Sequence, residues 1–516
     1  MHARVQYPES IEPLVQFIET TPPAEIVDRT LAKLRAGIDP RTMLTASALA
    51  VVRSSDLPPG HHGGPLHPLA GLHAITHLVN HFEGEERFLP ILQHVALSNK
   101  HINDPVTGPY SLLEFAPLDP SGAQVSRTAD LAADGSGDVI TSDGIQAAKD
   151  AFLKACSRGE SNKADHIFLW LWDHVPAIEA FDLLMSVAIP KNGLDDHYFL
   201  FPGYLWRGLE ALGTEHLKVL FRPAVRYVAR FPAQRVMPEA DQLIEDHGLL
   251  TRILRQRSGD DETAAVGALG EAIRGCKVYT EIPKMIAQAL ADGLSMEGAG
   301  EALSIGAAGL FMRSLTGNPM DVHLHTSANL RRYLVRLDGF SLKNKLLVLL
   351  TWHTGPEVKS TQYRMEPTIQ PDMDVVAALP HRSQEELLEA ITQSIYTQPP
   401  TDWSKVTNLG MMRAVPEVKS TVNLAQQYVD LRYDPQVLMH RLAEIVCHDS
   451  FTEMHAFKHH QAIVEEYRNT REPWRGMHLV AACQAAAVSF GKNMTVYEDI
   501  LELLHAAQPS PPASLL

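Results

Sequence analysis

The stretch GHHGGPLHPLAGLHAITHLVNHF, residues 60–82, joins a glycine-rich turn to a helical repeat of apolar residues. Leu72, Ile75 and Val79 follow one another at intervals of three and four, the spacing that places side chains on one face of an α-helix. Pro68 suits the first turn of such a helix. The stretch therefore predicts a turn followed by an amphipathic helix whose apolar face packs on the protein core.

The same spacing of apolar residues recurs along most of the chain and predicts an all-α fold. It is clearest in the stretches 11–36, 166–188, 204–229, 383–396 and 450–468. We expect one large multi-helix domain over residues 1–507, either undivided or built from two lobes, 1–260 and 261–507.

Two segments lack the helical pattern. Residues 104–145 contain the turn sequences VTGPYS, LDPSGAQ and ADGSGD, and we expect a long loop or lid there, because loops of this length are often functional. The tail 508–516 is rich in proline and serine and is expected to be flexible. The hexapeptide PEVKST occurs twice, at 356–361 and 416–421, and is interpreted as two equivalent structural turns.

The composition is that of an ordinary globular protein and excludes several classes of partner. The chain has 516 residues, of which 45% are hydrophobic, and a formal net charge of −16. An acidic chain without a block of Lys and Arg does not complement a nucleic-acid backbone. No apolar run approaches the roughly 20 residues that span a bilayer. We expect a cytoplasmic protein with a small-molecule substrate and no nucleic-acid or membrane partner, and the oligomeric state stays open.

The motifs of several common enzyme classes do not occur in the sequence. No GxSxG elbow, Walker A loop or strand-preceded GxGxxG is found, so we expect no Rossmann unit. The segment His73-Ala-Ile-Thr-His77 lacks the glutamate of a zinc-peptidase helix. The four cysteines are far apart and form no CxxC pair, so we expect reduced, mostly buried thiols.

Histidines are concentrated at the predicted start of the helix in 60–82. His61, His62 and His67 lie at this start or just before it, where the helix dipole keeps imidazole neutral. The neighbouring pair Gly63-Gly64 allows the backbone to approach a ligand closely.

Three more histidines, His73, His77 and His81, recur at i, i+4 and i+8 on the face opposite the apolar stripe. The simpler interpretation is a solvated polar face. Histidine is an uncommon choice for such a face, so we favour a site in which imidazole binds a metal or transfers protons near neutral pH.

Two other regions are expected to converge on these histidines. A capping box, Ser-Phe-Thr-Glu at 450–453, predicts the start of a helix on which His455 and Lys458 share a stripe with apolar residues and His459 borders it. Partial burial would make this lysine useful in catalysis. The alternative is a lysine that extends along the surface beside a core histidine.

The second region is the aromatic-rich segment that contains His197, Tyr198 and Trp206. Rings of this kind suit a planar aromatic substrate, because aromatic groups pack well beside one another. An ordinary aromatic core is the alternative.

These patterns predict an oxidoreductase in which residues from the two ends of the chain share one pocket. The expected catalytic residues are His67, His77, His455 and Lys458. In a metal-dependent version, iron, copper or zinc binds to His73, His77 and either His455 or His459. In another version, haem binds through an axial histidine. The expected substrate contacts are His62, His197, Tyr198 and Trp206. A helical binding scaffold with surface histidines is the non-enzymatic alternative.

Three places in the sequence resemble the questin oxidase-like family. They are the segment 63–77 with its His67-Pro68-Leu69 start, the segment 196–207, and the pair His455-x-x-Lys458. The resemblance implies a Baeyer–Villiger-type monooxygenase of polyketide pathways that opens anthraquinone-like rings and requires NADPH without a recognisable flavin site. It also implies that a histidine deprotonates a phenol and that Lys458 or another histidine stabilises the oxyanion. The chain departs from the family pattern in its extra histidines and in the segment 104–145.

Overall fold

The structure is a computed structural model that describes most of the chain. The described residues are 3–57, 63–114, 142–191, 196–213, 215–230, 238–251, 260–314, 319–363, 365, 369–397, 416–448, 454–489 and 496–506. They confirm the all-α fold, with 24 α-helices and four 3-10 helices. Within these ranges there is no β-sheet, only two isolated bridges, Arg4 with Leu113 and Ser314 with Met365.

The helices follow one another with short connections. The first part of the chain forms α1 (Glu12–Thr20), α2 (Ile26–Arg35), α3 (Pro40–Ser54), α4 (Leu66–Val79), η1 (Glu86–Phe88), α5 (Leu89–Asn103), α6 (Ser142–Arg158), α7 (Ser161–His174), α8 (Ala177–Ala188), α9 (His197–Leu212), α10 (Leu217–Ala229) and α11 (Pro238–Asp246). The second part forms α12 (Asp260–Gly275), η2 (Tyr279–Glu281), α13 (Ile282–Ala291), α14 (Met296–Phe311), η3 (Pro319–Val322), α15 (His323–Arg336), α16 (Leu342–Leu350), η4 (Trp352–Thr354), α17 (Pro356–Thr361), α18 (Met373–Ala378), α19 (Gln384–Tyr396), α20 (Pro416–Asp430), α21 (Pro435–Cys447), α22 (His455–Asn469), α23 (Gly476–Ser489) and α24 (Tyr497–Ala506).

Three of the predicted helices are each two helices. The stretch 11–36 is divided into α1 and α2 around Pro22-Pro23, and 166–188 into α7 and α8 at Pro176. The stretch 204–229 belongs to α9 and α10, which are separated after Gly213, a residue with a φ of +85°. Proline lacks the amide hydrogen that a helix needs, and glycine readily adopts a positive φ at a helix end.

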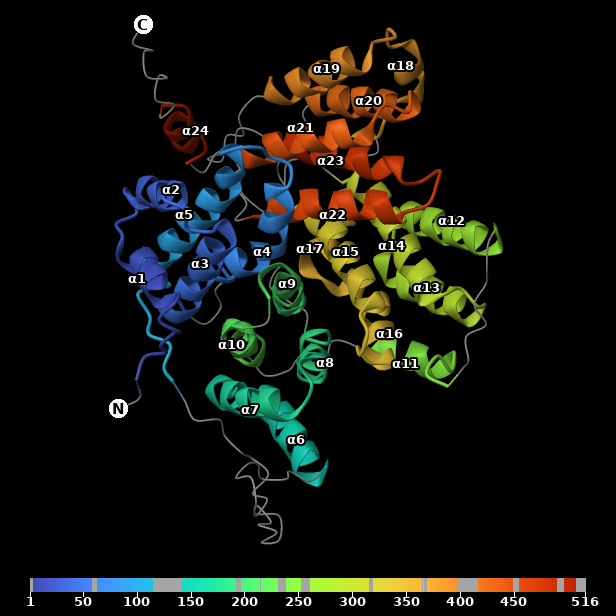
Figure 1. Cartoon of the computed structure of the whole chain (residues 1–516). Helices are drawn as coiled ribbons and strands as arrows, with labels where there is room; N and C mark the ends of the chain where they lie inside the picture. Colours follow the sequence, from blue (N-terminus) through green and yellow to red (C-terminus); the bar gives the residue numbers. More distant parts are fainter. Residues whose placement is uncertain are drawn as a thin grey trace, which may run out of the picture.

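Four helices from distant parts of the sequence pack together near the centre of the molecule (Figure 1). Helix α4 packs against α9 and α22, and α15 packs against the same two helices. In Figure 1, α22 lies across α15 and close to α4. A continuous hydrophobic cluster extends from Val5 to Leu504 around them. The division into lobes at residue 260 stays a prediction.

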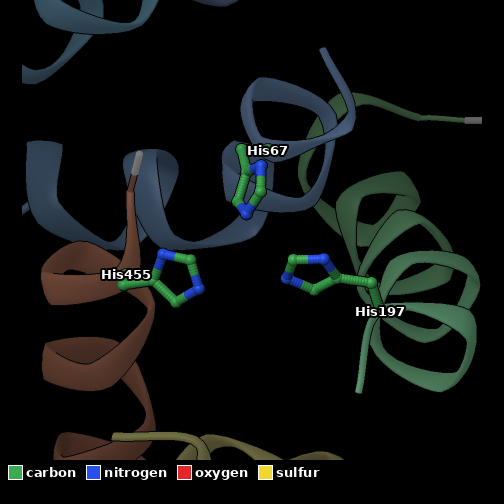
Figure 2. Close-up of side chains that lie close together, drawn as sticks. All are labelled: His67, His197 and His455. Carbon is green, nitrogen blue, oxygen red and sulfur yellow. The ribbon is translucent and has the colours of Figure 1, made fainter. Parts of the chain in front are cut away.

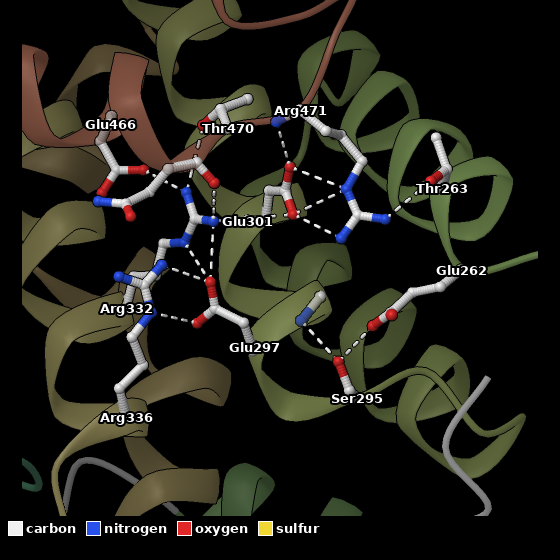
Figure 3. A network of polar contacts seen from close by, with 12 residues as sticks. Glu262, Thr263, Ser295, Glu297, Glu301, Arg332, Arg336, Glu466, Thr470 and Arg471 are labelled. Carbon is white, nitrogen blue, oxygen red and sulfur yellow. Dashed lines mark hydrogen bonds and ion pairs between the residues drawn. The ribbon is translucent and has the colours of Figure 1, made fainter. Parts of the chain in front are cut away.

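A buried ionic network fixes the contact between α14, α15 and α22 (Figure 3). The Arg332 guanidinium lies 2.8 Å from a carboxylate oxygen of Glu466 and 2.9 Å from one of Glu297. Arg471 donates to Glu301 in the same network. Because Arg332 and Glu466 are each 2% exposed, their attraction is weakly screened by water, and it holds α15 beside α22.

Several other predicted segments can be placed only in part. Of the expected loop 104–145, the structure describes 104–114 and the first residues of α6, and 115–141 lies outside the described residues, as does the tail 508–516. The PEVKST segments begin α17 and α20, so they are the first turns of helices and not isolated turns. In the described ranges, every helix is too short or too polar to cross a lipid bilayer.

Candidate metal centre

Four histidines lie at the beginning of the four central helices. His67 is the second residue of α4, while His197, His323 and His455 are the first residues of α9, α15 and α22. Figure 2 shows the rings of His67, His197 and His455 pointing toward a common space from three different helices. We call these three residues the buried triad. All four side chains are at most 3% exposed.

The nitrogens of the buried triad are close enough to share one ion. One ring nitrogen from each histidine lies within 4.8 Å of those of the other two. An equilateral triangle with sides of 4.8 Å has each corner about 2.8 Å from its centre, so a shift of under about 1 Å per ring would give the metal–nitrogen distance of about 2.0–2.1 Å.

His323 extends the cluster to a fourth ring. Its Nε2 lies 3.0 Å from Nε2 of His455, so one of the two nitrogens carries the hydrogen of that bond. The ring centroids of His323 and His197 are 5.9 Å apart. His323 can therefore orient His455 from behind or replace a ring of the buried triad as a ligand.

Burial keeps the imidazoles neutral. It lowers the pKa of His67 and of His455 well below the usual range, and the neighbouring charge of Lys458 lowers both further. The positive ends of the helices that begin at these residues act in the same direction. A neutral imidazole keeps the lone pair that a metal requires.

The turn before α4 sets the orientation of the His67 ring. Nδ1 of His67 lies 3.1 Å from the carbonyl oxygen of Gly63 and 3.3 Å from that of Gly64. A carbonyl can only accept, so Nδ1 carries the hydrogen and the lone pair is on Nε2. Metal-binding histidines are commonly fixed in this way by a hydrogen bond at the other ring nitrogen.

Lys458 lies on the first turn of α22 and is 3% exposed. Its ammonium nitrogen is 5.9 Å from the ring centroid of Tyr204. The alternative of a lysine that extends along the surface is therefore wrong. The capping box predicted before it, 450–453, lies outside the described residues, and α22 begins at His455 after Met454, which has a left-handed φ of 72°.

The structure does not bring together the four histidines expected to bind a metal, so that set is corrected. Nε2 of His73 lies 3.1 Å from Glu465 and 2.8 Å from Arg207. His77 lies with His81, their Nε2 atoms being 3.4 Å apart. Residues spaced by four drift about 40° around a helix, so His73 and His77 point to different neighbours.

The other two histidines of that set also separate, although both are on α22. His455 joins the buried triad, whereas Nε2 of His459 lies 3.1 Å from Nδ1 of His325. His325 in turn contacts His478, with 3.3 Å between their ring nitrogens. His459 therefore belongs to a separate buried chain of histidines, and the single pocket expected for His67, His73, His77 and Lys458 is divided among several places.

The expected substrate contacts have different surroundings. His197 is part of the buried triad, and His62 lies outside the described residues. Tyr198 stacks on Tyr227 with 4.8 Å between ring centroids, and Trp206 stacks on Phe181 at 4.5 Å. The rings of Tyr198 and Trp206 thus pack in the aromatic core, and their role as substrate contacts stays a prediction.

Sequence reasoning missed His323, His325, His460 and His478 as members of histidine clusters. The available signals were weak: His323 and His325 form a His-x-His pair, and His459 and His460 are adjacent. Neither spacing identifies partners on other helices.

Comparison with known proteins gives no relative: no protein-family model, curated protein or solved structure matches the chain.

Proposed function

We propose that the protein is a metal-dependent oxidoreductase that oxidises an aromatic or other electron-rich small molecule with O2, and that the buried triad holds the metal. The observation that carries this proposal is the convergence of three buried imidazoles with ligand atoms within 4.8 Å of one another. A general base needs one histidine, whereas a transition ion needs several nitrogens around one point.

The chemistry of the ligand set favours iron, copper or zinc. Imidazole suits these ions, whereas magnesium and calcium prefer oxygen ligands. Three protein nitrogens leave a coordination position for substrate or oxygen, as in catalytic sites. Bound iron or copper would supply redox chemistry with O2, and bound zinc would act as a Lewis acid.

The residues around the triad would favour an anionic form of the substrate. Lys458 is buried beside His67 and His455, and helices α4, α9, α15 and α22 direct their positive ends at the same place. A phenol or hydroquinone that binds there would ionise more readily, because nearby positive charge stabilises the phenolate. An ionised phenol is electron-rich and reacts more easily with oxygen.

The resemblance to questin oxidase-like proteins supports the oxygenase class. The motifs on which it rests contribute His67, His197, His455 and Lys458, all of which belong to the buried triad or lie beside it. NADPH as the electron donor is part of this proposal on the resemblance alone.

The competing proposal is a metal-free oxygenase in which one histidine is the general base and Lys458 stabilises the oxyanion. The burial of Lys458 next to the triad favours this second candidate. The two differ in whether metal removal abolishes activity.

The test is oxygen uptake with a panel of hydroxyanthraquinones, with and without NADPH, before and after metal removal by a chelator. His197→Gln should lower uptake at least about 100-fold, as expected for loss of a metal ligand. His174→Gln is the matched control, because His174 is a half-buried histidine of α7 that is held by the Trp170 carbonyl. Full activity after metal removal would favour the metal-free mechanism. Equal uptake by the wild type and His197→Gln would contradict both.

A further inference from the structure

A second group of three histidines lies at the other end of α4. One ring nitrogen from each of His77, His81 and His460 lies within 4.8 Å of those of the other two. The ring centroids of His81 are 5.1 Å from those of His77 and His460. We propose that these residues, the outer triad, form a second metal site that binds a divalent transition ion of the zinc class. This inference does not depend on the proposed function.

His460 is oriented as a ligand before any ion binds. Its Nε2 lies 2.9 Å from the carbonyl oxygen of Met439, so Nε2 carries the hydrogen and Nδ1 the lone pair. Within the described part of the chain, Nδ1 is buried and has no hydrogen-bond partner, although the side chain is only 2% exposed. A buried acceptor without a partner is uncommon in folded proteins, and a bound cation would satisfy it.

The other two rings also present lone pairs. Burial lowers the pKa of His77 to about 3 and that of His81 to about 4, and a neighbouring histidine adds to each shift. Both imidazoles are therefore neutral at pH 7, the form that binds metal. The dimensions of the outer triad match those of the buried triad, so the same small shift of each ring would close the site around an ion.

The outer triad differs from the buried triad in its access to solvent. His77 and His81 line an open cavity of about 590 Å³ between the end of α4 and helices α21 and α22. Arg441, on the same wall, is paired with Glu444 at 3.3 Å and so adds little net charge. An ion held by three protein nitrogens would keep one position open toward this cavity. The site should therefore exchange its metal more readily than the buried triad does.

Co2+ is a suitable probe because it replaces zinc and absorbs visible light when nitrogen-ligated. The full chain, stripped with a chelator, would be titrated with Co2+ at neutral pH, with metal content checked by elemental analysis. His81→Gln removes one ligand of the outer triad, and His197→Gln removes one of the buried triad. His440→Gln is the matched control, because His440 lies on the same cavity wall and is 51% exposed.

We expect His81→Gln to weaken one class of Co2+ binding at least about 100-fold, and His440→Gln to bind as the wild type does. The His81→Gln effect should persist in a His197→Gln background, which separates this inference from the proposed function. Unchanged Co2+ binding in His81→Gln would overturn the inference, and so would equal losses in His81→Gln and His440→Gln. Circular dichroism spectra like that of the wild type would show that each variant is folded.

Discussion

Gly63 is the residue on which the position of His67 most depends. Its φ is +101°, a conformation that side chains other than glycine rarely adopt. A Cβ atom at this position would lie 2.4 Å from Cε2 of Phe201. The carbonyl of Gly63 also accepts the hydrogen bond from Nδ1 of His67. The glycine thus allows close approach of this turn to α9 and orients a histidine of the buried triad.

We predict that Gly63→Ala destabilises the protein by about 3 kcal/mol, since strained backbone and overpacking add. It should also lower metal content, because the turn must move and carries His67 with it. Gly37→Ala is the matched control, with a φ of +97° and no atom within 4 Å of the added Cβ. It should cost about 1 kcal/mol from backbone strain alone and leave metal content unchanged. Urea denaturation and elemental analysis measure both effects, and equal metal loss in the two variants would contradict the explanation.

Helices α4 and α22 each supply one histidine to each triad. His67 and His77 are ten residues apart on α4, about 15 Å at the helical rise, and His455 and His460 lie on opposite sides of the first turns of α22. The packing of these two helices therefore determines both sites. A change at their contact should affect the two sites together, whereas a ligand variant should affect only one.

The network of Arg332 and Glu466 is the corresponding device between α15 and α22. Burial alone would raise the pKa of Glu466, but Arg332 outweighs this effect and the pKa is lowered. Arg332→Met would leave a buried carboxylate without its main partner, and we predict a loss of about 3–5 kcal/mol in unfolding free energy. The double variant Arg332→Met with Glu466→Met should recover most of it, because no buried charge remains. Denaturation midpoints test this, and a double variant no more stable than the single one would contradict the prediction.

At this scale the sequence predicted helix type well and helix limits less well. The apolar spacing indicated helices in 11–36 and 166–188, but tertiary packing and the prolines Pro22 and Pro176 decided where each stretch divides. The region of Ser383 was predicted more closely, since the structure contains a complete capping box with Glu386 and α19 begins directly after it. Local hydrogen bonds can be inferred from neighbouring residues, whereas chain reversal depends on what the helix packs against.

Over the whole molecule, the many buried histidines should make the protein sensitive to acid. Burial lowers the pKa of His94 and of His478 to about 4. Below about pH 6.5 the unfolded chain gains protons on these rings, while the folded chain does not until about pH 4. Stability therefore falls as pH falls through this window and levels off below it.

Each such histidine should remove about 3 kcal/mol over the window. The check is urea denaturation of the metal-free protein between about pH 7 and pH 4.5. His94→Gln keeps a polar side chain that can bond Ser47 and the Pro68 carbonyl, the partners of His94, so its stability should depend less steeply on pH by one proton. Stability that is constant or increases on acidification would contradict the prediction.

The candidate site was predictable from the sequence only in part. His67, His455 and Lys458 were selected, because histidines at a glycine-rich helix start and a lysine within an apolar stripe are unusual locally. The partnership with His197 and His323 was not, since they begin helices that are far away in the sequence. Which histidines meet depends on how α4, α9, α15 and α22 pack, and spacing along one helix does not contain that information.

The most direct test of the central claim is the metal environment of His81→Gln, a variant in which the outer triad is disabled. Elemental analysis and X-ray absorption at the metal edge would be measured on the purified protein and on the same variant carrying His197→Gln. We predict about one transition ion per chain with at least three nitrogen neighbours at about 2.0–2.1 Å, and its loss when His197 is also replaced. An absent ion, or a first shell that His197→Gln leaves unchanged, would contradict the assignment of the metal to the buried triad.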